Sequence, residues 1–422
     1  MNGSEWCVRF PLQKNFNFVF GLESNLEIQD VKIELDNMKS IEGYQSDIQI
    51  GRSKYKYRNG NQKYSRSVVI KNYPASFPKP AFTEITFSNE IFVFNKVIPF
   101  FKTMDDSISN LFPEFYCGCL DFSEKEEGCI IMENLQENHY RLTNSKVFLD
   151  IEHLMLSMKK IGEFHAYSYQ AKQQRSKEFY SLVDGLVDTH YVITNVIIGF
   201  LPPIIEYFLD VLSAESKYYN EKVHEIRLLV GDVEKFIATI FTTRTEPTAV
   251  LCHGDFLRNN LMFKYDEEDV PVHVKFIDLG NMRYCSPVTD LGLILYMNAD
   301  QTTREEYWDA LIDAYYDSMK NTFPKNDSIP SKDEILLEFK HNVLAPCLLL
   351  SSFLPYMMAI EEHNRSLSTV DEFSQEYEDY KDTSFFSSST DVIVNNTIKL
   401  FRPHRTERVL QILRDVINRG FI

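Results

Sequence analysis

Three polar side chains in the middle of the chain have the types and spacing that phosphoryl transfer needs. Asp255 and Asn260 lie in the stretch Cys252-His253-Gly254-Asp255-Phe256-Leu257-Arg258-Asn259-Asn260, and Asp278 follows in Phe276-Ile277-Asp278-Leu279-Gly280. In phosphoryl transfer to a hydroxyl, one carboxylate accepts the hydroxyl proton, while an amide and a second carboxylate hold the metal bridging the phosphates. We therefore predict Asp255 as the catalytic base, and Asn260 and Asp278 as ligands of Mg²⁺, because oxygen donors suit this hard cation better than zinc.

Short apolar runs surround these residues and predict the strands that hold them. Ala249-Val250-Leu251 precedes the loop, Leu261-Met262-Phe263 follows it, and Val272 to Ile277 leads into Asp278. Such strands would put the three ligands on one side of a cleft. A His-Gly-Asp tripeptide alone is more often an ordinary turn, so the assignment also depends on upstream residues.

A lysine and a glutamate upstream complete the pattern. Ser67-Val68-Val69-Ile70-Lys71 is a β-branched run that ends in Lys71, the residue type that holds phosphates. In the next segment Phe87, Ile91 and Phe94 recur at helical spacing and place Glu90 beside an apolar stripe. We expect an ion pair between Lys71 and Glu90 that orients the lysine, although either residue alone would pass for an ordinary surface group.

With these motifs the chain resembles the CHK-type kinase-like family, the ecdysteroid-kinase-like proteins, which are similar to choline kinases and aminoglycoside phosphotransferases. The resemblance runs in the family's order from about residue 40 to 300, and the last 120 or so residues match only in general character. The matching residues are Val69-Ile70-Lys71, Phe87-Ser88-Asn89-Glu90-Ile91, Val97-Ile98-Pro99, Ile131-Met132-Glu133-Asn134-Leu135, Gly162-Glu163-Phe164-His165-Ala166, His253-Gly254-Asp255, Asn259-Asn260-Leu261-Met262-Phe263, Arg283-Tyr284 and Ser286-Pro287-Val288-Thr289-Asp290-Leu291.

The resemblance implies a two-lobed, protein-kinase-like α+β fold that binds ATP with Mg²⁺ and phosphorylates a small-molecule hydroxyl. Residues 1–135 would form a small N-lobe with an antiparallel sheet, and residues 136–422 a larger, mostly helical C-lobe. The backbone of the hinge from Glu133 to Leu135 would bind adenine. Gly43 and Ser46 lie where the family places its phosphate-covering loop, and they are the candidates for phosphate contacts.

The strand and helix signals agree with such an N-lobe. Two strand-like runs are joined by Asn59-Gly60, a strong hairpin signal, and a second hairpin follows an inserted helix. We expect strands at Ile48 to Tyr57, Lys63 to Tyr73, Phe115 to Phe122 and Cys129 to Met132, and the helix at Phe82 to Val97.

Departures from the family pattern keep a second class of function open. Leu279-Gly280 replaces the usual Phe and Gln after the metal-binding aspartate, and Leu257 stands where the family has Trp. The segment Glu42 to Asp47 holds only one glycine. The alternative is therefore a nucleotide-binding pseudokinase that sequesters a small ligand. Because Lys71, Glu90, Asp255, Asn260 and Asp278 are all present, we favour the active enzyme.

The segment after Asp278 indicates the class of acceptor. Only eleven residues separate Asp278 from Asp290, and no Ala-Pro-Glu follows, which leaves too little chain for a peptide-docking platform. The resemblance implies that Asp290 accepts backbone N–H groups of the catalytic loop. On the helix expected to begin near Asp150, His165 lies on the apolar face, and we interpret it as a packed structural residue.

The acceptor itself is not determined by these patterns. The apolar run Val343 to Ile360 favours a lipophilic alcohol, and a choline- or ethanolamine-type acceptor is the alternative. The resemblance to the family implies an ecdysteroid or a detoxified xenobiotic as that alcohol. The residues that could line either pocket are Tyr296, Trp308, Tyr315, Tyr316, Phe353, Tyr356 and Met357.

Bulk properties predict a cytoplasmic enzyme. With 44 basic and 61 acidic residues the net charge is −17, which disfavours nucleic-acid and anionic-membrane partners. The first 22 residues lack the apolar core of a signal peptide. Asn342 to Ile360 is nearly apolar but contains Pro346 and Pro355, so we expect a buried helix pair and no membrane insertion. The seven cysteines lack metal-binding spacing and predict reduced, buried thiols.

Overall fold

The computed structural model forms two compact units. One comprises Met1–Arg141 with Lys275–Gly280, and the other Leu142–Val274 with Asn281–Ile422. The boundary expected at residue 135 thus falls after Arg141, and the segment that carries Asp278 returns to the first unit. The structure describes residues 28–35, 41–42, 47–57, 63–73, 81–121, 127–145, 147–187, 201–242, 244–366 and 399–422.

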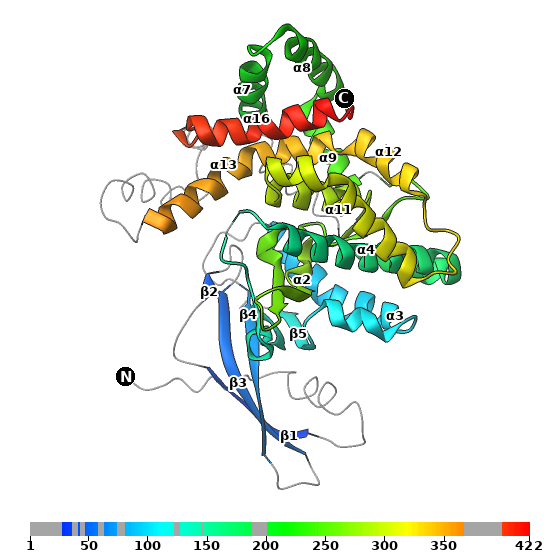
Figure 1. The fold of residues 1–422 in the computed structure, drawn as a ribbon. Coiled ribbons are helices and arrows are strands. Elements are labelled where there is room, and N and C mark those ends of the chain that lie inside the picture. The colour runs from blue at the N-terminus through cyan, green and yellow to red at the C-terminus, as the bar shows by residue number, and fades with distance from the viewer. Residues whose placement is uncertain are drawn as a thin grey trace. The chain divides into compact units, whose positions relative to one another are not determined.

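An antiparallel sheet dominates the first unit (Figure 1). Its strand order is β1-β3-β4-β6-β5, and the two-residue strand β2 pairs with β3. The strands are β1 Ile28–Leu35, β2 Ile41–Glu42, β3 Asp47–Tyr57, β4 Lys63–Asn72, β5 Phe115–Asp121 and β6 Glu127–Glu133. All four predicted strands are present within one or two residues of their expected bounds.

The pleat of β4 explains how Lys71 is presented. Val68 and Ile70 alternate with Val69 and Lys71, and the first pair is buried while the second is only half-buried. Lys71 lies opposite Ile48 of β3 and Ile130 of β6. The lysine therefore projects from the middle of the sheet, on the face opposite the buried Val68 and Ile70.

The helix expected at Phe82 to Val97 is present and longer than expected. It consists of α2 (Ala81–Phe92), a π-helical turn η1 (Val93–Val97) and α3 (Ile98–Lys102). Pro99 does not end it, because the π-helical turn directly before this proline shifts the hydrogen-bond register, and the Ile98 N–H group donates to the Val93 carbonyl oxygen. A 3₁₀ helix η2 (Asp106–Leu111), capped by Asp105, then leads to β5.

Helices make up most of the second unit. They are α4 Ile151–Gln174, α5 Ser176–Val183, α7 Leu201–Ser213, α8 Lys217–Val230, α9 Val233–Thr242, α10 Val288–Leu293, η6 Ile294–Asn298, α11 Gln301–Thr322, α12 Lys332–Asn342, α13 Leu344–Ser366 and α16 Pro403–Asn418. The expected helix at Asp150 begins as α4, with the Asp150 carboxylate capping the His153 N–H group at 3.0 Å.

The long helices α4 and α11 pack side by side (Figure 1). Gly162 permits this close approach, because a Cβ atom there would lie 2.3 Å from the Tyr315 carbonyl oxygen. One turn along α4, His165 faces the same neighbour. The family motif around Gly162 thus has a packing explanation.

Short strands of the second unit frame the predicted catalytic loop. β8 (Val250–Cys252) pairs antiparallel with β11 (Arg283–Cys285). β9 (Leu261–Tyr265) pairs with β10 (Pro271–Phe276), whose last residues enter the first unit. A 3₁₀ turn η4 (Arg258–Asn260) joins the loop to β9, as the apolar runs around it predict.

The expected helix pair at Asn342 to Ile360 is wrong, because α13 is one continuous helix from Leu344 to Ser366. Pro346 lies in its first turn, and Pro355 lies inside it. A single interior proline removes one backbone hydrogen bond, whereas the helix buries apolar side chains such as Leu348 and Leu354. Among the described residues, no helix has the length and apolar character to cross a membrane.

The thiol prediction is confirmed only in part. Cys117, Cys252, Cys285 and Cys347 are buried and reduced. Cys119 and Cys129 are half-buried instead. They lie opposite each other near the end of the β5–β6 ladder, with their sulfur atoms 3.8 Å apart. Cys7 lies outside the described residues.

Candidate functional site

In the first unit, Lys71 joins two carboxylates. Its Nζ atom lies 2.6 Å from Glu90 Oε2 and 2.7 Å from Asp278 Oδ1. Burial alone would lower the pKa of Lys71, but the Asp278 and Glu90 carboxylates outweigh it and raise that pKa above its ordinary value. The predicted ion pair with Glu90 is present, and the additional pair with Asp278 keeps the ammonium group fully charged.

Asp278 stands in an unusual backbone conformation. Its φ is 63°, in the left-handed region that non-glycine residues seldom adopt. The turn after it is held by α2, since Asn89 donates to the Gly280 carbonyl oxygen at 3.2 Å. A Cβ atom on Gly280 would lie 2.5 Å from the Thr86 carbonyl oxygen, so this position needs glycine. The Asp278 side chain is 40% exposed, which lets a metal ion reach it.

The predicted hinge is anchored by backbone and side-chain hydrogen bonds around Glu133. The Glu133 N–H group donates to the Glu114 carbonyl oxygen at 2.8 Å, and Glu133 Oε2 accepts from Lys275 at 3.2 Å. Asn134 accepts from the Gln136 N–H group. Leu135, the last residue of the predicted hinge, is buried. These bonds hold the backbone of Glu133 and Asn134 in place, and binding of adenine at the predicted hinge would depend on that backbone.

In the second unit, the predicted catalytic loop turns at Gly254. This residue has a φ of 83°, and a Cβ atom on it would lie 2.0 Å from the Asn281 carbonyl oxygen. Asn260 Nδ2 donates to the Asp255 backbone oxygen at 2.8 Å and to Asp255 Oδ2 at 2.9 Å. The spacing of five residues thus brings the predicted base and a predicted metal ligand into direct contact.

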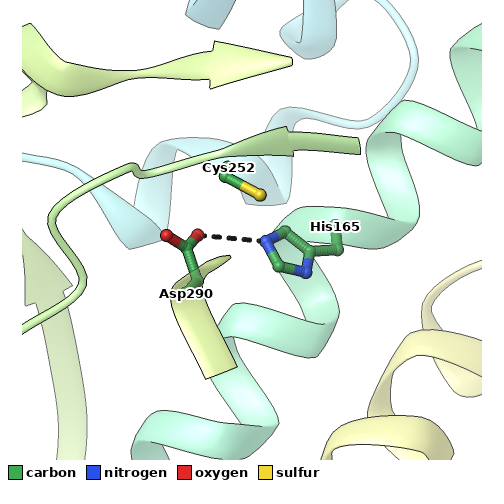
Figure 2. Close-up of side chains that lie close together, drawn as sticks. All are labelled: His165, Cys252 and Asp290. Atoms are coloured by element: carbon green, nitrogen blue, oxygen red, sulfur yellow. Dashed lines mark hydrogen bonds and ion pairs between the residues drawn. The ribbon is translucent and has the colours of Figure 1, made fainter. Parts of the chain in front are cut away.

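Asp290 braces this loop from a fully buried position, as the resemblance implies. Its Oδ2 accepts from the His253 N–H group at 2.7 Å, and its Oδ1 accepts from the Gly254 N–H group at 2.9 Å. His165 Nε2 lies 3.2 Å from Oδ2, as Figure 2 shows, and His165 Nδ1 lies 3.0 Å from the Tyr315 hydroxyl. His165 is therefore a packed, hydrogen-bonded residue.

His165, Cys252 and Asp290 also come close enough to be considered as metal ligands, with their donor atoms within 4.8 Å of one another (Figure 2). Zinc binding would require a thiolate, but burial raises the pKa of the Cys252 thiol well above its ordinary value. Both Asp290 oxygens already accept backbone N–H groups. We interpret this cluster as a structural hydrogen-bond network.

Comparison with known proteins identifies the family. The model of the ecdysteroid kinase-like family matches residues 40–326. The chain belongs to this family. No curated protein gives a significant match.

Solved phosphotransferase structures are similar at low identity. The GDP complex of wild-type aminoglycoside 2′-phosphotransferase-IIIa has 10% identity and a TM-score of 0.37, covering 92% of this chain and 99% of that one. The AMP-bound complex of spectinomycin phosphotransferase APH(9)-Ia has 13% identity and a TM-score of 0.37, covering 93% of this chain and 100% of that one. These similarities concern the fold alone.

In this member of the ecdysteroid kinase-like family, the predicted catalytic loop is also supported by two buried residues, Arg258 and Asn298. Neither of them was selected from the sequence. Arg258 Nη1 donates to the backbone oxygens of Thr143, at 3.1 Å, and Ser145, at 2.6 Å. Asn298 Oδ1 accepts from the Arg258 N–H group at 2.9 Å. The signal available in the sequence was an arginine placed between the apolar pair Phe256-Leu257 and the candidate ligand Asn260.

The remaining predicted residues fall into two groups. Gly43 and Ser46 lie outside the described residues. Among the aromatic candidates for the acceptor pocket, Tyr296 and Tyr315 are fully buried in the core of the second unit. The half-buried candidates are Tyr316, Phe353, Tyr356 and Met357, the last three on α13.

Proposed function

We propose that this chain is an ATP- and Mg²⁺-dependent phosphotransferase that acts on a hydroxyl group of a small molecule. The observation that carries the proposal is the pairing of Lys71 with both Glu90 and Asp278 at 2.6 and 2.7 Å. A lysine oriented by a glutamate and placed beside a metal-ligand aspartate is what phosphate binding requires. Membership of the ecdysteroid kinase-like family supports the same assignment.

The donor set fits Mg²⁺ bound to a nucleotide. Asp278 and Asn260 would hold the ion through a carboxylate and an amide oxygen, and Lys71 would hold the phosphates. When bound, Mg-ATP supplies the γ-phosphoryl group and neutralises the charge that develops on its oxygens. Glu133 and Leu135 would contribute backbone hydrogen-bonding groups to the adenine of the nucleotide. The Glu133 N–H group is already bonded to the Glu114 carbonyl oxygen.

Asp255 would hold the acceptor hydroxyl and take its proton. The oxygen of that hydroxyl attacks the γ-phosphorus, the bond to the β-phosphate oxygen breaks, and the products are a phosphate ester and ADP. The hydrogen bond from Asn260 to Asp255 Oδ2 orients the carboxylate for this role. Asp290, which holds the backbone before Asp255, is a positioning residue.

An ecdysteroid or another lipophilic alcohol is the acceptor class that we propose. Support comes from the short link between Asp278 and Asp290, which leads directly into the buried helix α10, and from the apolar helix α13. The half-buried Phe353, Tyr356 and Met357 on α13 are the aromatic and apolar groups proposed to contact it.

Product formation tests this function directly. Purified protein would be incubated with ATP and MgCl₂ and a panel of hydroxylated steroids, choline, ethanolamine and glycosides, with mass spectrometry of the products. We expect a phosphate ester of a lipophilic alcohol from the wild type and none from Asp255→Asn. ATP consumption without any phosphorylated acceptor, or phosphate transfer to generic protein substrates, would overturn the proposal.

A further inference from the structure

The second unit contains two buried arginines that lack a full set of acceptors. Arg304 of α11 has 0% exposure, and Arg408 of α16 has 6%. Each donates a hydrogen bond to the same Ala299 carbonyl oxygen, from Arg304 Nη1 at 2.6 Å and from Arg408 Nη2 at 2.5 Å. The two guanidinium groups are therefore immediate neighbours inside the protein.

Several donors of this pair have no acceptor in the described part of the chain. They are Nε and Nη2 of Arg304 and Nε of Arg408, and the Tyr296 hydroxyl is also unbonded. Tyr296 belongs to the same cluster, because the Arg304 guanidinium carbon lies 5.3 Å from its ring centroid. Buried donors without acceptors are costly, so such a set points to a missing hydrogen-bond acceptor.

Charge in this cluster is also out of balance. Asp415 is the one carboxylate of the described residues within 4.0 Å of Arg304, at 3.6 Å, and it is shared with Arg419 at 2.9 Å. Arg408 has no carboxylate within that distance among the described residues; it contacts the Phe148 ring and Gln411 instead. Arginine keeps its proton in proteins, so the cluster holds more positive than negative charge.

Arg405, on the same helix α16 as Arg408, is a buried arginine whose three nitrogens all donate hydrogen bonds. It is 2% exposed, and its Nη2 atom lies 2.5 Å from Glu362 Oε2. Its remaining nitrogens bond Glu362 Oε1 and the Leu400 carbonyl oxygen. Arg304 and Arg408 are also buried, but neither has a carboxylate within hydrogen-bonding distance among the described residues.

We propose that Arg304 and Arg408 bind a small inorganic anion of the size of chloride, between the two guanidinium groups and within reach of the Tyr296 hydroxyl. Because Arg304 is fully buried, a large organic anion does not fit, and exchange requires local opening of α16 from α11. The anion supplies the acceptor and the negative charge that the protein atoms do not. It is a structural ligand of the second unit, independent of the proposed reaction.

Thermal unfolding in matched salts tests this site. The protein would be dialysed into sodium chloride, sodium bromide or sodium gluconate at equal ionic strength, and Tm measured in each. We expect Tm to be higher by about 2 °C or more in either halide than in gluconate. An equal Tm in all three salts would mean an ordered water at this position and would overturn the proposal.

Two variants separate the site from general salt effects. Arg408→Met removes one guanidinium group and should abolish the halide-dependent shift, whereas Arg405→Met should lower Tm in every salt but keep that shift. A shift that persists in Arg408→Met would contradict the proposal. If a variant does not fold, wild-type crystals grown in bromide still decide, through the presence or absence of an anomalous peak between Arg304 and Arg408.

Discussion

Two aspartates of the chain, Asp278 and Asp290, show how the same side chain serves two purposes. Asp278 is 40% exposed and pairs with one lysine, in a strained backbone conformation. Asp290 is 0% exposed, and its two oxygens accept from two backbone N–H groups and from His165. An accessible carboxylate can bind a metal, whereas a saturated one can only hold the backbone. Asp255 is half-buried and belongs with the accessible group.

Removing the accessible carboxylate at the proposed metal site should have the largest effect. Asp278→Ala is expected to abolish both Mg²⁺-dependent ATP binding and turnover, because the other proposed ligand, Asn260, offers only a neutral amide oxygen. Isothermal titration with and without Mg²⁺ would measure the binding. Glu84→Ala, an exposed change on α2, is the control and should bind normally. A lowered Tm with intact nucleotide affinity would instead show Asp278 to be structural.

A conservative change at Asp255 should separate catalysis from binding. Asp255→Asn keeps an oxygen for the Asn260 bond but cannot accept the hydroxyl proton, so turnover should fall by at least about a hundredfold. ATP affinity and Tm should stay at wild-type values. Steady-state kinetics with Asp309→Asn as a control would measure this. Equal turnover in the Asp255 variant would remove it from the proposed mechanism.

The same Asp-to-Asn change at Asp290 should act on stability instead. Both of its oxygens accept backbone N–H groups, so an asparagine must direct its NH₂ group at one of those donors. We expect the free energy of unfolding to fall by about 2 kcal/mol, with turnover reduced because the loop before Asp255 is displaced. Chemical denaturation beside Asp255→Asn measures the contrast. Equal stability of the two variants would contradict the assigned division of roles.

Several residues of the candidate site could be predicted from the sequence, because the patterns that mark them are local. Asp255 and Asn260 lie in one loop between apolar runs, and Lys71 ends a β-branched strand. The contact between Asn260 and Asp255 follows from their spacing across one short turn, whereas the pair between Lys71 and Asp278 depends on the fold. Both hairpins of the first unit were predictable for the same reason, whereas the two-lobed α+β fold was implied by the family resemblance.

The buried arginines could not be predicted in this way. Arg304 and Arg408 meet only because α11 and α16 pack together, more than a hundred residues apart in sequence. Arg304 lies at helical spacing from Trp308 and Leu311, and Arg408 from Ile412. These spacings place each arginine beside an apolar stripe, but they do not indicate which helix packs against it. The interior proline of α13 likewise depends on packing, since burial of its neighbours outweighs a local break signal.

The smallest effect we expect concerns the charge balance around Lys71 and depends on pH. In the wild type the pKa of Lys71 is raised, so its contribution to stability is present below the ordinary lysine pKa and is lost only as pH rises through the folded value. Burial already raises the pKa of Glu90 above its ordinary value, and Lys71 opposes that shift. Lys71→Met removes the opposing cation, so burial and repulsion from Asp278 raise the pKa of Glu90 further in the folded state.

The variant should therefore lose stability as pH rises from 5 to 8, because its folded state then binds more protons than its unfolded state. We expect the difference between wild type and Lys71→Met to be about 1 kcal/mol larger at pH 8 than at pH 5. Urea denaturation at both pH values measures it, with Lys96→Met as an exposed control on the same unit. A difference that does not change with pH would mean that Lys71 contributes through packing of its aliphatic stem, and that the carboxylates beside it do not need its charge.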